Sequence, residues 1–216
     1  MARRTETRRR NCRIFGLPIA FLAALAALVA APGAQAGPLV ESAEGCKSAA
    51  LERPFEPWVD YMDYVLVGRG TFENGTAGWS LDEASVVEGN EPYYVHGAGE
   101  HRSLAISSGG KATSATMCVG LEEPTLRLFM KSSSRSLLSS LKVEVLFEDV
   151  TGTVRSLPIG TASALTSGSW TPHLPMLCTA NLLSLIDDKS PGRFRFSAQW
   201  PANWQSDDVY VDPRYR

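Results

Sequence analysis

Residues 141–148 read LKVEVLFE, and this stretch decides the fold class. Apolar side chains occupy every second position and charged ones stand between them, which is the period of a β-strand with one buried face. The apolar positions are Leu141, Val143, Val145 and Phe147, and the charged ones are Lys142, Glu144 and Glu148, with Leu146 as the exception.

The same alternation recurs along the chain between clusters of Gly, Ser, Pro and Asp, so we expect about nine short strands at spacings near ten residues. The runs are 64–67, 84–88, 92–95, 103–106, 125–131, 141–148, 153–159, 193–200 and 207–211. Residues 179–188 fit a helix and a strand equally well. Two packed antiparallel sheets satisfy this pattern, which predicts an all-β antiparallel β-sandwich.

The first 36 residues have the pattern of a signal peptide. Six arginines precede an apolar run over 14–31, and Ala34-Gln35-Ala36 then forms a small-residue cleavage site before Gly37. An uncleaved membrane anchor is the alternative, because the apolar run approaches the length of a bilayer span. We predict cleavage, and therefore a chain that is secreted or associated with the cell envelope.

Cleavage changes the charge of the chain. The whole sequence carries 21 basic and 23 acidic residues, and loss of residues 1–36 leaves 15 against 22, a net charge of −7. Nucleic acids and anionic membrane surfaces select basic partners, so we predict neither as a partner after cleavage. The remaining 180 residues suit one domain, which we expect to be a monomer. We place an extended arm at 37–60 and the sandwich at 61–216.

Three cysteines remain after cleavage, so one intrachain disulfide at most leaves one thiol over. We favour Cys46–Cys118, which would join the arm to the sandwich, with Cys178 left over. Closing a loop of that length would stabilise the fold by roughly 4 kcal/mol on the chain-entropy model.

Two stretches resemble family 4/9-type carbohydrate-binding modules, which are galactose-binding-like jelly rolls. VGRGTFENGTAGWSLDEASVVEGN (67–90) is similar to their first strand and its Gly-containing loop, and NWQSDDVYVDP (203–213) to their last strand. The arm, GNEPYYVHGAG (89–99) and MCVGLEEPTLRLF (117–129) also resemble a group of exported bacterial proteins built on this jelly roll. Arg69 and Ser206 depart from the pattern of the modules, which weakens a turn and the inward packing of the last strand.

The resemblance implies a structural calcium where the first and last strands approach each other. The matching ligands are Glu73, Asp207 and Asp208, and oxygen donors of this kind suit calcium. Adjacent strand residues point to opposite faces, so one aspartate of the pair is expected to coordinate, and we favour Asp207.

Sugar binding needs exposed aromatic faces and a few planar hydrogen-bonding groups. We expect the available residues to be Tyr93, Tyr94, Trp170 and Trp200, with Arg127 as a hydrogen-bond donor. Tyr93 and Tyr94 are neighbours on an expected strand, so one site would use one of them.

No nucleophile, zinc or nucleotide motif is present in the sequence, so we predict that the protein is not an enzyme. The leading hypothesis is an exported, non-catalytic binding module for a saccharide or cell-envelope polymer. The alternative is a structural or protein-interaction β-sandwich without a sugar site, and a small hydrolase stands third.

Overall fold

The computed structural model describes residues 38–39, 50–120, 125–149, 151–178 and 189–212, and every structural statement below concerns these residues. They form eleven strands and one 3₁₀ turn, η1 (Glu56–Trp58). The strands are β1 (Val65–Leu66), β2 (Ser80–Glu88), β3 (Arg102–Thr113), β4 (Met117–Gly120), β5 (Thr125–Ser132), β6 (Ser140–Glu148), β7 (Val154–Ser163), β8 (Thr171–Pro172), β9 (Met176–Leu177), β10 (Lys189–Ala198) and β11 (Trp204–Val211). In this part of the chain, no helix has the length and apolar character needed to cross a membrane.

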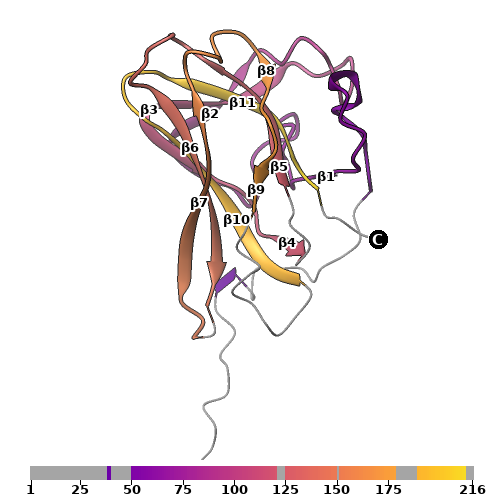
Figure 1. Cartoon of the computed structure of the whole chain (residues 1–216), viewed down its shortest axis with the longest axis vertical. Helices are drawn as coiled ribbons and strands as arrows, with labels where there is room; N and C mark the ends of the chain where they lie inside the picture. The colour runs from indigo at the N-terminus through magenta and orange to yellow at the C-terminus, as the bar shows by residue number, and fades with distance from the viewer. Residues whose placement is uncertain (1–37, 40–49, 121–124, 150, 179–188, 213–216) are drawn as a thin grey trace, which may run out of the picture. The chain divides into compact units, whose positions relative to one another are not determined.

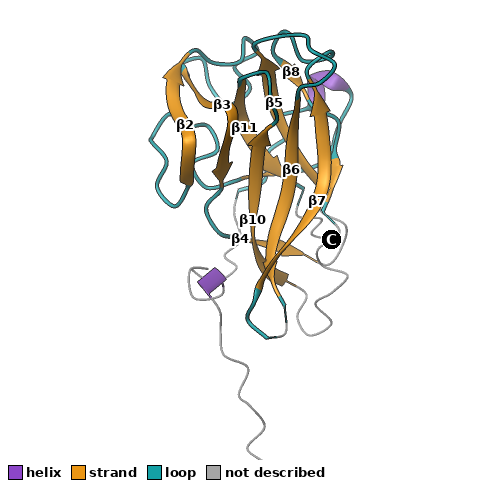
Figure 2. Cartoon of the chain, turned by 90° about the vertical axis from the view of Figure 1, so that its left-hand side faces the viewer, coloured by secondary structure: helices purple, strands orange, loops and turns teal. Residues whose placement is uncertain are grey.

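All strand pairs are antiparallel, and they build the two layers of a jelly-roll sandwich. One layer runs in the order β7-β6-β10-β3, with β2 beside β3 and β4 beside β10. Figure 2 shows β10, β6 and β7 side by side in it. The other layer contains β11 and β5, with β1, β8 and β9 along their edges. The predicted all-β antiparallel sandwich is therefore confirmed.

Strand β3 belongs to both layers. Its residues 111–113 pair with β10, and its residues 104–106 pair with β11. Gly109 and Gly110 lie between these segments. Gly109 has a φ of 87°, and a Cβ on Gly110 would lie 2.6 Å from the carbonyl oxygen of Glu83 on β2. Glycine therefore permits both the backbone change and the close strand approach at the bend.

The main core lies between the two layers. The four apolar positions predicted in the 141–148 run are all buried in it, together with side chains from β3, β5, β10 and β11. On the opposite face of β6, Glu144 is nearly buried because Lys142 and Arg195 lie against it, with nitrogen–oxygen distances of 2.9 and 2.8 Å. The side chains of β6 therefore alternate between the two faces of the strand, and the charged ones lie on the face opposite the main core.

A second apolar cluster lies on the outer face of the β5/β11 layer. Phe129 of β5 and Tyr210 of β11 point away from the main core, and Phe55 and Tyr64 cover them. The Phe55 and Phe129 rings stack with centroids 5.4 Å apart. Residues 50–64, which we call the arm segment, therefore form a third, partial layer (Figure 1, indigo).

The prediction of a strand at 92–95 is wrong. The structure has a turn there, because the carboxylate of Glu91 accepts the backbone N–H groups of Tyr93 and Val95. Tyr94 between them has a φ of 51°, in the left-handed region. Hydrogen bonds from the backbone to a nearby side chain compete with the hydrogen bonds of a strand pair. At Glu91 the side-chain hydrogen bonds form, and the segment is a turn. The undecided segment 179–188 lies outside the described residues.

Candidate functional site

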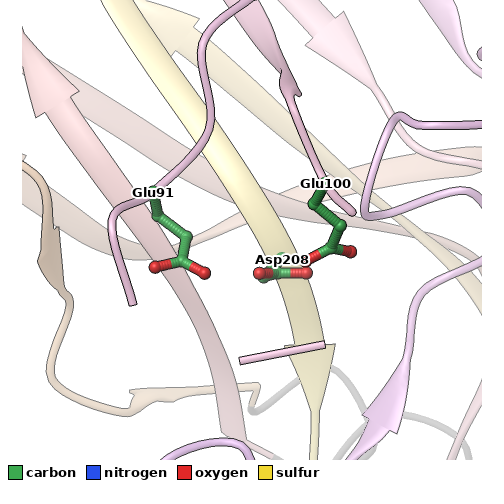
Figure 3. A group of neighbouring side chains, drawn as sticks. All are labelled: Glu91, Glu100 and Asp208. Atoms are coloured by element: carbon green, nitrogen blue, oxygen red, sulfur yellow. The ribbon is translucent and has the colours of Figure 1, made fainter. Parts of the chain in front are cut away.

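Three carboxylates from separate segments meet beside β11, and we call them the carboxylate triad. Glu91 follows β2, Glu100 precedes β3, and Asp208 belongs to β11. One oxygen of each lies within 4.8 Å of the others, and Figure 3 shows the three groups converging. Glu91 and Asp208 are fully buried, and Glu100 is 8% exposed.

A β-bulge brings Asp208 into the triad. Trp204 and Val209 both point into the main core, although they are five residues apart and strict alternation would place them on opposite faces. The pairing of β11 with β5 shifts register after Asp207, and Asp208 has a φ of 48°. An extra residue in the strand accounts for both features. Both aspartates are consequently buried, and Asp208 joins the triad.

The triad is short of hydrogen-bond donors. Both carboxylate oxygens of Asp208, and Oε1 of Glu100, are buried without a partner among the described residues. Glu91 differs, since its Oε1 accepts the Val95 N–H at 2.9 Å and its Oε2 accepts the Tyr93 N–H. An ionised carboxylate that is buried without donors is strongly destabilising. The triad therefore requires either protons or a cation.

The pKa values express the same requirement. Burial, followed by the charges of Glu100 and Glu91, raises the pKa of Asp208 to about 8. Burial and the neighbouring Asp208 raise the pKa of Asp207 to about 9. Burial also raises the pKa of Glu100. In the absence of a cation, protons are the available means of reducing this concentration of negative charge.

The donor set fits a hard divalent cation. All the ligand atoms are carboxylate oxygens with a combined charge of −3, and no sulfur or imidazole ligand stands among them. Calcium takes six to eight oxygen ligands, which carboxylates binding through one or two oxygens, backbone carbonyls and water supply together. The residues present thus fit the calcium that the sequence resemblance implies.

Two of the predicted ligands have other tasks in the structure. Oε1 of Glu73 accepts the backbone N–H groups of His101 at 2.8 Å and Arg102 at 2.7 Å, which fixes the start of β3. The Asp207 carboxylate accepts the N–H of Asp208 at 2.9 Å. The structure therefore brings Asp208 together with Glu91 and Glu100, and calcium itself stays a prediction.

Of the four aromatic residues predicted for sugar binding, Tyr93 and Trp170 lie together. The Tyr93 hydroxyl donates to the Trp170 carbonyl oxygen at 3.2 Å. Tyr94 is half exposed on the same turn, and Trp200 lies on the β10–β11 loop and is 71% exposed. The Trp58 ring of the arm segment meets Tyr93 edge to face, with centroids 4.8 Å apart. These contacts connect Tyr93 to the arm segment.

A pocket of about 600 Å³ opens between the arm segment and the β5/β9 edge, and we call it the arm pocket. Aromatic side chains and ionised groups share its lining, which is the combination that polar ring-shaped ligands require. The lining residues are Trp58, Val59, Asp60, Tyr61, Met62, Tyr64, Thr125, Arg127, Leu174, Pro175, Leu177 and Asp212.

Arg127, the predicted hydrogen-bond donor, is at this pocket but nearly buried. Its Nη1 pairs with Asp60 Oδ2, its Nε donates to the His173 carbonyl oxygen at 2.9 Å, and its guanidinium carbon lies 4.0 Å from the centre of the Phe55 ring. The Tyr64 hydroxyl donates to the same Asp60 oxygen at 2.7 Å. Although burial raises the pKa of Asp60, hydrogen bonds from Tyr64, the Met62 N–H and Arg127 outweigh it and lower the pKa.

Sequence reasoning did not select the residues that matter most at these two places. Glu91 and Glu100 lie in a loop and carry no motif, and their convergence on Asp208 depends on how β2 and β3 turn. Trp58 lies in the expected arm, 37–60, which has little periodicity, and Tyr61 directly follows that arm. The aromatic residues of this region were the sequence feature that could have indicated a binding surface there.

The disulfide prediction is not tested, because Cys46 lies outside the described residues. Cys178 is a free, buried thiol. Burial raises its pKa to about 12.

No family model and no curated protein matches the chain. Solved structures that match include carbohydrate-binding modules of β-sandwich type, the class that the sequence resembles, and an α-L-arabinofuranosidase. One holds the CBM22-1 and GH10 modules of Clostridium thermocellum endo-1,4-β-D-xylanase 10B complexed with xylohexaose (17% identity, TM-score 0.46), covering 68% of this chain and 28% of that one. The CBM22-1 xylan-binding domain of Paenibacillus barcinonensis Xyn10C is 14% identical, with a TM-score of 0.43 and coverage of 66% and 90%.

A third match is TmCBM61 in complex with β-1,4-galactotriose, at 13% identity and a TM-score of 0.40, covering 68% of this chain and 96% of that one. At these identities and TM-scores, the similarities carry no argument for a ligand or an activity. The argument for function therefore depends on the side chains of this chain.

Proposed function

We propose that the protein is a non-catalytic saccharide-binding module and that the arm pocket is its binding site. The observation that carries the proposal is the lining of that pocket. Trp58 and the exposed Tyr61 supply aromatic surface, and Asp60 and Arg127 supply planar polar groups. Sugar rings stack their C–H faces on aromatic rings, while their hydroxyls bond to carboxylates and guanidinium groups.

The polar groups of the pocket favour binding over proton transfer. The pKa of Asp60 is lowered, so the carboxylate is ionised near neutral pH and acts as a hydrogen-bond acceptor. A general acid for glycoside cleavage needs the opposite, a raised pKa. The Arg127–Asp60 pair thus supports a role in holding hydroxyl groups.

We propose further that the carboxylate triad holds a calcium ion, as the sequence resemblance implied. The support is the unpartnered, fully buried Asp208 carboxylate facing two other acids. Glu91, Glu100 and Asp208 would hold the ion, and the ion would supply the positive charge that the fold lacks there. The signal-peptide pattern of residues 1–36 supports export, where calcium and cell-envelope polymers are both present.

Affinity electrophoresis against a panel of polysaccharides tests the binding proposal, run with calcium and with chelator. We expect at least one polymer to retard the protein. Tyr61→Ala should then weaken retardation about fivefold, because one exposed stacking ring contributes about 1 kcal/mol. Tyr94→Ala is the matched control, since Tyr94 is 50% exposed against 60% for Tyr61 but does not line the pocket.

Two results would count against the arm pocket. If no polymer retards the protein in either buffer, the saccharide proposal fails for that panel. If Tyr61→Ala and Tyr94→Ala are retarded equally, the ligand binds elsewhere on the molecule.

A protein-interaction domain is the second candidate, and a specific surface favours it. Leu137, Leu138, Leu165 and Trp200 are exposed by 80, 74, 45 and 71% on three loops at one end of the sandwich. Ser139 joins these loops, since its carbonyl accepts the Ala164 N–H at 3.1 Å and its hydroxyl donates to the Gln199 carbonyl oxygen at 2.9 Å. Exposed apolar patches mark interaction sites. If Trp200→Ala, and not Tyr61→Ala, abolishes binding of a purified partner protein, this candidate replaces the first.

A further inference from the structure

We propose that the cation at the carboxylate triad positions one wall of the arm pocket, through Glu91 and Tyr93, so that cation and saccharide bind cooperatively. The inference rests on the proposed function, because it concerns the same pocket. It adds to the proposed stabilising role of the ion, because it assigns Glu91 and Tyr93 as positioning residues between the carboxylate triad and the arm pocket.

The first step is from the cation to the turn that carries Tyr93. Glu91 contributes a carboxylate to the triad, and the same carboxylate accepts the Tyr93 and Val95 N–H groups. A carboxylate oxygen has more than one lone pair, so it can bind a cation and accept a hydrogen bond together. The ion that fixes the Glu91 side chain therefore also fixes the backbone of the turn.

The second step is from the turn to the pocket wall. The Tyr93 ring packs edge to face on Trp58 at 4.8 Å and lies 5.7 Å from the ring of Phe129. Its hydroxyl donates to the Trp170 carbonyl oxygen at 3.2 Å. Trp58 also lines the arm pocket. Tyr93 thus supports Trp58 together with Phe129, whose ring centre lies 5.3 Å from that of Trp58.

The third step is what happens without the ion. Glu91 and Glu100 stand near the two ends of the loop between β2 and β3, and both face Asp208. In the ion's absence protons neutralise part of this charge, but they do not join the three carboxyl groups as a shared cation does. The loop ends are then held less firmly, and Tyr93 moves with them. Saccharide binding would then have to restore the Tyr93–Trp58 contact, which lowers affinity.

A quenching experiment tests the coupling without any saccharide. Acrylamide quenching of Trp58 fluorescence is measured in calcium and in chelator, with Trp58→Phe used to subtract the other four tryptophans. We expect calcium to protect Trp58 from quencher, and to slow hydrogen exchange at the Tyr93 and Val95 amides. If calcium binds by calorimetry but neither signal changes, the coupling is overturned. If calcium does not bind at all, the proposal fails at its first step.

A comparison of wild type and Tyr93→Ala, each with calcium and with chelator, tests the effect on the ligand. Removing calcium should weaken retardation of the wild-type protein by roughly 5- to 150-fold, the usual range of coupling between two sites. In Tyr93→Ala the link is cut, so calcium should still bind but retardation should no longer depend on it. An unchanged calcium dependence in Tyr93→Ala would overturn the assignment of Tyr93.

The two proposals fail in distinguishable ways. If the saccharide proposal is wrong, no polymer retards the protein in either buffer, while calcium still protects Trp58 from quencher. If the coupling is wrong, a polymer retards the protein equally with and without calcium.

Discussion

Replacing Asp208 with Asn should change stability in opposite directions in two buffers. In chelator, wild-type Asp208 is a fully buried carboxyl among like charges, and burial with those charges raises its pKa to about 8. Asn is neutral at this position without taking up a proton, so the variant is expected to be as stable as wild type or more stable. In calcium, the same change removes a ligand, so the variant should be the less stable protein.

The size of the effect follows from mass action. An ion present at about a hundred times its Kd stabilises the folded state by about 2.7 kcal/mol. In a chain of this length, each kcal/mol moves Tm by about 2–4 °C. Calcium should therefore raise the Tm of the wild type by roughly 5–10 °C, and that of Asp208→Asn by less than about 2 °C.

Thermal unfolding by circular dichroism, in chelator and in calcium, measures both proteins. Asp82→Asn is the control, because Asp82 is 61% exposed and its carboxylate lies 3.1 Å from Lys111 Nζ. This control should follow the wild type in both buffers. The reasoning is refuted if calcium leaves the wild-type Tm unchanged and Asp208→Asn is destabilised equally in both buffers.

Three further predictions concern other parts of the molecule. Asp60→Asn leaves the nearly buried Arg127 without its charged partner and should lower the free energy of unfolding by about 3 kcal/mol in urea titration; a loss below about 1 kcal/mol would contradict the pairing. Because burial raises the pKa of Cys178 to about 12, its thiol should not react with a thiol reagent in the native protein at about pH 8, but should react in denaturant. Gly110→Ala places a Cβ 2.6 Å from the Glu83 carbonyl oxygen, so it should cost about 1–3 kcal/mol, and a neutral result would show that β2 and β3 separate easily.

The fold was predictable because its signal is local and repeated. Alternation over 141–148 reappears in the structure residue by residue, and four of its side chains enter the main core. Strand β3 is an exception, because the strand expected at 103–106 is much longer in the structure and covers Arg102–Thr113. Serines and glycines at its centre conceal the continuation, because a bend between two layers needs small residues where a flat strand would carry large ones.

The site was predictable only in part, for two physical reasons. Strict alternation favoured Asp207 as the ligand, but a bulge changes the face of β11 and turns Asp208 toward the other acids. A bulge depends on the partner strand as much as on the bulged residues, so one strand's pattern does not reveal it.

The second reason concerns Glu91. Alternation predicted a strand at 92–95, while the Glu91 side chain binds the N–H groups of Tyr93 and Val95 and forms a turn. That turn, and not strand parity, decides where Tyr93 points. Its contact with Trp58 joins residues 35 positions apart in sequence, which no local pattern contains.

Chemical-shift mapping of the five tryptophan indole N–H signals tests the central claim most directly. An oligosaccharide from the polymer that retards the protein is titrated into it in the presence of calcium. The account predicts that the Trp58 signal shifts strongly. The signals of Trp200, on the β10–β11 loop outside the pocket lining, and of Trp204, in the core, should not shift. If the Trp58 signal does not shift and the Trp200 signal does, the ligand binds near the β10–β11 loop and the arm pocket is not the site.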